Sequence, residues 1–133
     1  MKRYILISLV FATFILSSAF SPSARWELLG AKKINKSYDR DVITVTAAEG
    51  TFNALRFKVK YRPVTIYDMK VHYGNGSVED IKIRYHVQAG GESRIINLRG
   101  RDRVITKVVF RYETKTFKGK RAEIRLFGLH IYV

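Results

Sequence analysis

The sequence predicts an all-β fold: an antiparallel β-sandwich of jelly-roll-like topology with about seven or eight strands, preceded by an N-terminal signal helix. Three observations support this prediction. Short runs of alternating apolar and polar residues recur along the chain, and turns rich in glycine, asparagine and proline separate them. Beyond the first 20 residues, no stretch keeps the 3.6-residue apolar period of an amphipathic helix.

Residues 1–19 are predicted to be an export signal. Lys2 and Arg3 are followed by an uncharged run, and small residues precede a predicted cleavage site after Ala19, with cleavage after Ala24 as the alternative. An uncleaved membrane anchor is the competing interpretation, because residues 4–20 are 17 uncharged residues in a row. We expect cleavage and then periplasmic or extracellular localisation, with 20–25 as a short linker and 26–133 as a single β-sandwich domain.

Strands are expected, in chain order, at residues 26–30, 41–46, 52–62, 64–73, 77–87, 93–98, 104–114 and 122–127. The cleanest alternation is in 52–62, where Leu55, Phe57, Val59 and Tyr61 are predicted to point inward. Residues 32–40 are expected to form a polar loop, and 128–133 an apolar tail. Gly90 and Gly91 are expected to form a turn.

The strongest local signal is a hairpin at residues 64–87 with Gly74, Asn75 and Gly76 at its tip. A two-residue turn would mix apolar and charged side chains on both faces. A three-residue loop instead gathers the apolar residues on one face and pairs opposite charges on the other. We therefore predict these pairs: Met69 with Ile81, Tyr67 with Ile83, Thr65 with Tyr85, Lys70 with Asp80, and Asp68 with Lys82. His72 and His86 would then lie about 26 Å apart, too far to share a metal ion.

Several short motifs resemble a known family. They are Trp26-Glu27-Leu28-Leu29-Gly30, Asp39-Arg40-Asp41, Phe52 with Leu55-Arg56, Tyr67-Asp68-Met69-Lys70-Val71, Ala89-Gly90-Gly91, Ile96-Asn97-Leu98-Arg99-Gly100 and Arg103-Val104-Ile105. As a set, the motifs are similar to a family of small exported bacterial proteins known only as a domain of unknown function. The resemblance implies export and a β fold over roughly residues 26–128, and it implies no activity, cofactor or catalytic residue.

No catalytic or metal-binding pattern stands out, and we predict neither an enzyme nor a cofactor. The sequence contains no cysteine, which excludes thiolate chemistry and disulfides. Asp39 and Asp41 are interpreted as a turn acid and ion-pair partners, because a calcium site needs more oxygen ligands. Asp68 and Asp80 each face a lysine in the predicted hairpin, which suits ion pairing and not a general acid.

The basic excess is the feature that carries a functional hypothesis. The chain has 25 Lys and Arg against 11 Asp and Glu, a formal net charge of +14. Such a charge attracts polyanions by electrostatic steering and counterion release. The predicted anion-binding residues form one strand row and two turn clusters: Arg56, Lys58, Lys60, Arg62; Arg99, Arg101, Arg103; Lys118, Lys120.

The favoured hypothesis is a non-catalytic exported module that associates with anionic cell-envelope material, such as lipid headgroups, lipopolysaccharide or acidic glycans. A specific nucleic-acid partner is not expected, because the signal removes the protein from the cytoplasm. The alternative is a module that binds a neutral carbohydrate or a protein through an exposed Trp26 or tyrosine platform. A hydrolase that uses Asp39, Asp41 or the hairpin aspartates is the third hypothesis.

Overall fold

The computed structural model describes residues 23–34, 38–45, 50–114 and 119–132. The predicted signal segment and Lys118 lie outside these ranges. The described part of the chain contains no helix long and apolar enough to cross a membrane. Within it the chain forms nine strands: β1 (Ser23–Lys33), β2 (Tyr38–Thr44), β3 (Thr51–Phe52), β4 (Ala54–Lys60), β5 (Val64–Tyr73), β6 (Val78–Val87), β7 (Ile96–Asn97), β8 (Arg103–Glu113) and β9 (Glu123–Tyr132).

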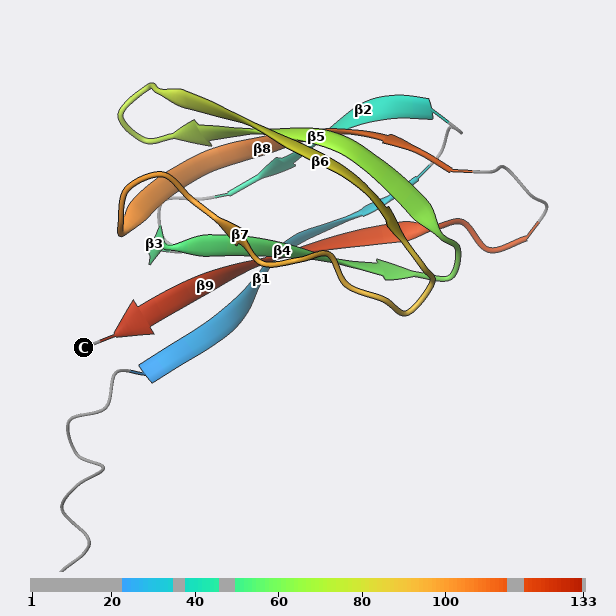
Figure 1. Cartoon of the computed structure of the whole chain (residues 1–133), viewed down its shortest axis with the longest axis horizontal. Coiled ribbons are helices and arrows are strands. Elements are labelled where there is room, and N and C mark those ends of the chain that lie inside the picture. The colour runs from blue at the N-terminus through green and yellow to red at the C-terminus, as the bar shows by residue number, and fades with distance from the viewer. Residues whose placement is uncertain (1–22, 35–37, 46–49, 115–118, 133) are drawn as a thin grey trace, which may run out of the picture.

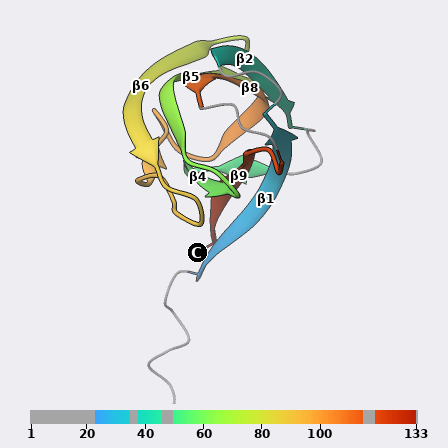
Figure 2. The same ribbon diagram turned by 90° about the vertical axis from the view of Figure 1, so that its right-hand side faces the viewer.

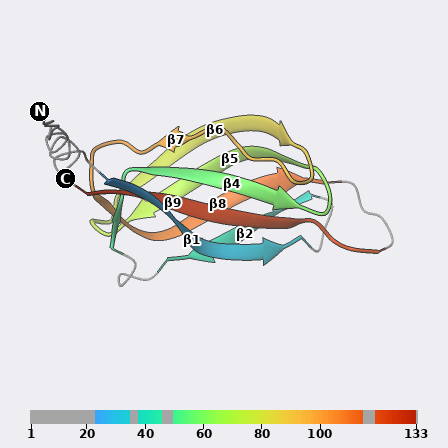
Figure 3. The same cartoon turned by 90° about the horizontal axis from the view of Figure 1, so that it is seen from below.

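The strands form two antiparallel sheets that face each other, which confirms the predicted all-β sandwich (Figure 1). One sheet has the order β1-β9-β4-β7, and the other has the order β2-β8-β5-β6 with β3 paired to β8. Seen end-on, the two sheets curve around a shared interior (Figure 2). At one edge of the sandwich β1 and β2 lie side by side (Figure 3).

The strand pairing is nested around the predicted central hairpin. β5 pairs with β6, β4 with β7, β2 with β8 and β1 with β9. The chain is therefore one long hairpin whose tip is β5–β6, folded over so that most successive strands alternate between the two sheets. This is the jelly-roll arrangement, in which two Greek keys share a pair of sheets.

The core lies between the sheets and is built from the inward positions of each strand. Leu55, Phe57 and Val59 of β4 are buried, as their alternation predicts, and Phe57 meets Phe110 of β8 with ring centroids 5.7 Å apart. Burying each such side chain contributes roughly 1.5–3 kcal/mol. The outward positions of the same strands remain available for polar residues, and these build the site described below.

The hairpin tip has the predicted three-residue loop. The Tyr73 amide donates to the Ser77 carbonyl at 2.9 Å, and Gly76 has a φ of 89°, which an L side chain rarely adopts. From the loop to Asp68 the observed register agrees with the prediction, since Met69 pairs with Ile81 and Lys70 with Asp80. The ion pairs differ, as described below.

Beyond Asp68 the predicted hairpin register is wrong, because a β-bulge interrupts it. Ile66 pairs with Tyr85, and Thr65 pairs with His86, whose Nδ1 lies 2.8 Å from the threonine Oγ1. Arg84 lies in the bulge with a φ of 47°. The inward set of β5 changes at the same point, so Val64 and Ile66 are buried and Tyr67 is not. Tyr85, predicted to point inward, is exposed.

Two glycines explain why β1 and β9 are longer than predicted. A Cβ at Gly128 would lie 2.5 Å from the Phe52 ring, and one at Gly30 would lie 2.5 Å from Ile43 Cγ2. Both glycines therefore mark close packing inside a strand and not a strand end. Residues 128–132 of the predicted apolar tail are part of β9, and β1 begins at Ser23, inside the segment predicted as a linker.

Other strand boundaries also differ from prediction. The predicted 52–62 strand divides into β3 and β4 and ends at Lys60, so Tyr61 is exposed, with a φ of 74°, and does not point inward. The predicted strand at 93–98 is reduced to β7, and the 32–40 loop is shortened because β1 reaches Lys33 and β2 starts at Tyr38.

Candidate functional site

The predicted cation row lies on the outer face of the sheet β1-β9-β4-β7. In register, Arg56 of β4 lies opposite Phe127 of β9, and Lys58 lies opposite Arg125. Phe127 in turn lies opposite Leu28 of β1. Cations and apolar side chains from three strands therefore share one surface. We call this surface the aromatic–basic face, and its members are Trp26, Leu28, Lys33, Arg56, Lys58, Lys60, Glu92, Glu123, Arg125, Phe127 and Leu129.

Arg56 is the most constrained cation of this face. Its guanidinium lies over the Trp26 ring at 4.3 Å from the centroid, and its Nη1 lies 3.1 Å from Glu92 Oε2. The Arg56 Nε is the one buried side-chain nitrogen or oxygen without a hydrogen-bond partner in the described part of the chain. Leaving such a donor unpaired costs roughly 1–3 kcal/mol. The neighbours of Arg56 thus hold its side chain in place but leave one of its hydrogen-bond donors unpaired.

The basic end of the face surrounds Glu123. Arg125 Nε donates to Glu123 Oε1 at 2.5 Å, and this hydrogen bond is the main cause that lowers the pKa of the Glu123 carboxyl, against the opposing effect of burial. Lys60 and Lys33 lower that pKa further through their charge. Lys58 lies 5.0 Å from the Phe127 ring centroid and 3.7 Å from Glu92 Oε1. Both carboxylates of the face are therefore outnumbered by nearby cations.

The strand row continues into the loop that precedes β9. Arg62 does not lie on β4; its Nε donates to the Lys120 carbonyl at 2.7 Å, which ties the two segments together. Lys120 places its ammonium 4.1 Å from the Tyr61 ring centroid. The structure therefore brings Lys120 to the basic end of the aromatic–basic face.

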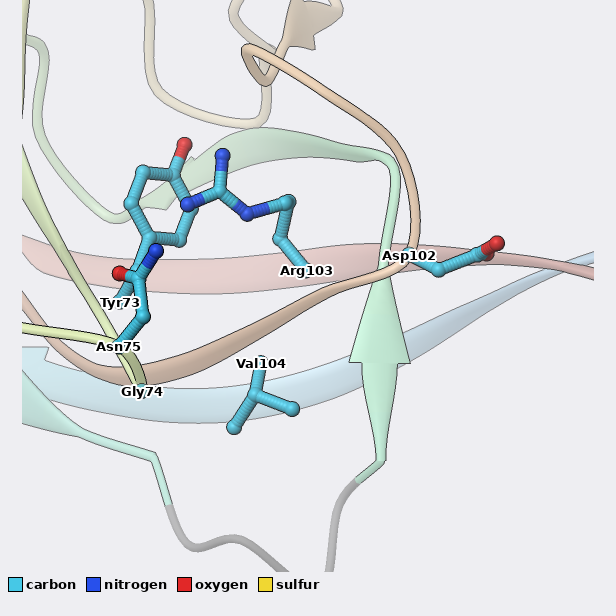
Figure 4. A pocket seen from close by; sticks show the side chains of 6 residues that line it. All are labelled: Tyr73, Gly74, Asn75, Asp102, Arg103 and Val104. Atoms are coloured by element: carbon cyan, nitrogen blue, oxygen red, sulfur yellow. The ribbon is translucent and has the colours of Figure 1, made fainter. Parts of the chain in front are cut away.

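The Arg99–Arg103 cluster lies at the opposite end of the molecule, beside the tip of the β5–β6 hairpin. A shallow hollow of about 390 Å³ is lined there by Tyr73, Gly74, Asn75, Asp102, Arg103 and Val104. In Figure 4 the Arg103 guanidinium covers the Tyr73 ring, and the Asp102 carboxylate points away from both. Arg99 and Arg101 remain exposed at this end.

Arg103 is occupied by internal contacts. Its guanidinium lies 3.7 Å from the Tyr73 ring centroid and donates to the Arg99 carbonyl and to Ser77 Oγ. Tyr73 donates to Glu79 Oε1 at 2.5 Å, and burial, aided by this bond, raises the pKa of Tyr73. Arg103 therefore holds the hairpin loop against the β7–β8 connection.

The outer face of the other sheet, which we call the opposite face, is also basic. Its charged residues are Arg40, Asp68, Lys70, Asp80, Lys82, Lys107, Arg111 and Glu113. Five cations oppose three carboxylates there, against five and two on the aromatic–basic face. Charge alone does not select between the faces. The opposite face also has a cation near a ring, since the Arg111 guanidinium lies 5.8 Å from the Tyr67 ring centroid. On the aromatic–basic face the contacts of Arg56 with Trp26 and of Lys58 with Phe127 lie beside apolar Leu28 and Leu129, and this combination favours that face.

The cations of the opposite face affect the pKa of His72. Desolvation is the main cause that lowers the pKa of His72, and Lys107 and Lys70 lower it further through their charge. Its imidazole therefore favours the neutral form. In the described part of the chain, no three His, Asp or Glu side chains gather as a metal-binding group.

Asp68, Asp80 and Asp41 each have a partner; Asp68 and Asp80 share the opposite face, and Asp41 lies apart from them on β2. Asp68 accepts a hydrogen bond from Arg111 Nη2 at 2.6 Å, and Asp80 lies 3.7 Å from Lys82. These partners correct the prediction that each aspartate pairs with the lysine opposite it in the hairpin. Asp41 accepts from the Tyr112 hydroxyl at 2.9 Å.

Sequence reasoning missed two residues of the aromatic–basic face, Arg125 and Phe127. Their signal was present in the sequence, since Arg125 and Phe127 alternate with apolar Ile124 and Leu126, which are buried. The missing information was that β9 inserts between β1 and β4. That order brings Trp26 and Arg56 together across an intervening strand.

Comparison with known proteins gives one match. A family model described as a domain of unknown function, DUF2541, matches residues 5–128. No curated protein and no solved structure matches the chain.

Proposed function

Since the chain belongs to the DUF2541 family, whose function is unknown, we propose that it is a non-catalytic binding module, exported to the cell envelope, that associates with anionic material through its aromatic–basic face. The observation that carries this proposal is the joining of cations and aromatic rings from three strands on one sheet face. The proposed export rests on the predicted signal segment at residues 1–19.

The charge of the face supports a polyanion as ligand. Lys33, Arg56, Lys58, Lys60 and Arg125 outnumber Glu92 and Glu123, and Lys120 extends the positive region at one end. A surface with this excess raises the local concentration of anions and gains free energy when a polyanion releases its counterions. Lys58 and Lys60 of β4 are the candidates for contact. Lys58 and Arg56 both lie near Glu92, but 41% of the Lys58 side chain is exposed, against 20% for Arg56.

The contacts of Trp26 argue against a neutral-sugar platform. Stacking on a sugar needs an open ring face, yet the Arg56 guanidinium covers one face of Trp26 at 4.3 Å. A hydrolase is also disfavoured, since Asp68 is paired with Arg111, and Asp41 accepts a hydrogen bond from buried Tyr112. Anion association is therefore the function that the site supports best.

The test compares charge reversal on the two faces. We would measure binding to dextran sulfate across a salt series for K58E/K60E and for the matched K70E/K107E variant of the opposite face. Both variants change the net charge by the same amount. We expect the first to weaken binding about tenfold or more and to reduce the salt dependence, with a much smaller effect of the second. Equal effects would show that only net charge matters.

A further inference from the structure

We infer that the anionic ligand is the surface of a phospholipid bilayer, and that the end of the aromatic–basic face nearest Ser23 enters its headgroup region. This inference rests on the proposed function and names the ligand of the same face. It adds an apolar contact, which a soluble polyanion does not require.

The apolar side chains of the face gather at one end. Trp26 pairs with Leu129, Leu28 with Phe127, and Ile131 extends the strip next to Leu129. The side chains of Leu28 and Ile131 are large and apolar, yet these residues are 48% and 41% exposed. A contiguous exposed apolar strip of this kind marks a surface that contacts another apolar phase or partner.

The cations at the same end suit anionic lipid headgroups. Arg56 lies over Trp26, and Arg99 and Arg101 lie exposed at this end. Tryptophan favours the boundary between water and lipid, where its ring is in an apolar environment and its N–H remains hydrated. Each basic residue near an anionic bilayer contributes about 1 kcal/mol of attraction.

The course of the chain places this strip near a membrane. β1 begins at Ser23, three residues before Trp26, and the 17-residue uncharged run 4–20 precedes it. In Figure 1 the start of β1 and the end of β9 lie at the same end of the sandwich. If that run stays in the membrane, only residues 21 and 22 separate it from β1. The apolar strip is therefore the part of the domain best placed to remain in contact with lipid.

The single tryptophan of the chain makes the contact directly measurable. The protein would be recovered from cells that express the full chain, with its N-terminus determined by mass spectrometry. We would add vesicles of phosphatidylglycerol and phosphatidylcholine in equal parts, with and without bromine on the acyl chains. We expect the Trp26 emission to shift to shorter wavelength and to be quenched by the brominated lipid.

Matched variants separate insertion from charge attraction. L28Q/I131Q alters the apolar strip, and V78Q/V42Q alters two residues of the other sheet with similar exposure, 48% and 40%. We expect the first pair to weaken vesicle binding about tenfold and to reduce quenching, and the second to change neither. If L28Q/I131Q does not fold, quenching in the unmodified protein still decides the question.

The outcomes distinguish the two proposals. Vesicle binding without quenching, or equal loss in both variant pairs, would overturn the bilayer inference and leave the proposed function intact. Binding to dextran sulfate but not to vesicles would likewise overturn the bilayer inference and leave the proposed function intact. Failure to bind either ligand at low salt would overturn both.

Discussion

Replacement of Gly128 by alanine tests the interior packing of β9. Gly128 lies between Glu27 of β1 and Leu55 of β4, at a position where the sequence pattern had predicted only a tail. An alanine Cβ would lie 2.5 Å from Phe52 Cδ1 and 2.9 Å from Leu29 Cδ1, closer than real Cβ contacts allow. The ring of Phe52 is fully buried, so it has no open space into which to move.

The expected cost follows from this crowding. Forcing extra atoms into a packed core costs typically about 1–3 kcal/mol. For a domain of this size, that lowers the midpoint of thermal unfolding by roughly 4–15 °C. Gly74→Ala is the matched control, because the Val104 side chain that its Cβ would meet is partly exposed and free to shift. We expect the control to change stability by less than about 1 kcal/mol.

A double-mutant cycle identifies the cause of the loss. Denaturant unfolding would be measured for Gly128→Ala, Phe52→Leu and the combination of both. If the Phe52 ring causes the crowding, Gly128→Ala should lower the free energy of unfolding by about 1 kcal/mol less in the Phe52→Leu background than in the unmodified protein. Strict additivity, or no loss in Gly128→Ala, would refute the placement of Gly128 against Phe52 and the extension of β9.

Four further predictions concern charged or titratable side chains. Lys107→Met should raise the pKa of His72 in an NMR titration, because one of the charges that lower it is removed; an unchanged pKa would contradict the cationic field of the opposite face. Since the His72 pKa is lowered in the folded state, its protonation below pH 6.5 opposes folding, and His72→Gln should reduce the stability lost on acidification. Arg125→Gln should raise the pKa of Glu123, because the main cause that lowers it is lost. The stability that Glu123 contributes above about pH 4.5, which disappears as the pH falls through the lowered pKa, should therefore become smaller. Arg103→Ala should lower the free energy of unfolding by about 1–2 kcal/mol and speed amide hydrogen exchange at the hairpin tip. Unchanged protection of these amides would show that Arg103 does not hold the hairpin loop in place.

The sequence predicted what depends on local pattern. The alternation in β4 and the three-residue loop at Gly74–Gly76 both follow from neighbouring residues. The bulge near Tyr67 was also present as a local signal, since the apolar phase changes from Val64 and Ile66 to Met69. A hairpin continued in one register from its tip cannot accommodate that change of phase.

Contacts between distant strands were not predictable in the same way. Gly128 looked like a strand end, because the Phe52 ring that requires a glycine there belongs to another strand. The Trp26–Arg56 contact depends on β9 lying between β1 and β4, which no single segment encodes. Likewise the contact of Arg103 with the Tyr73 ring joins two distant segments, and anion binding by Arg103 stays a prediction.

The most direct test of the central claim is binding of the protein to a ligand panel across a salt series. The panel contains phosphatidylglycerol vesicles, lipopolysaccharide, an acidic glycan and a neutral glycan, with an unrelated protein of equal net charge as control. The account predicts binding to anionic ligands that exceeds the control and falls linearly with salt on logarithmic axes. Salt-insensitive binding to the neutral glycan, or anion binding no stronger than the control, would contradict it.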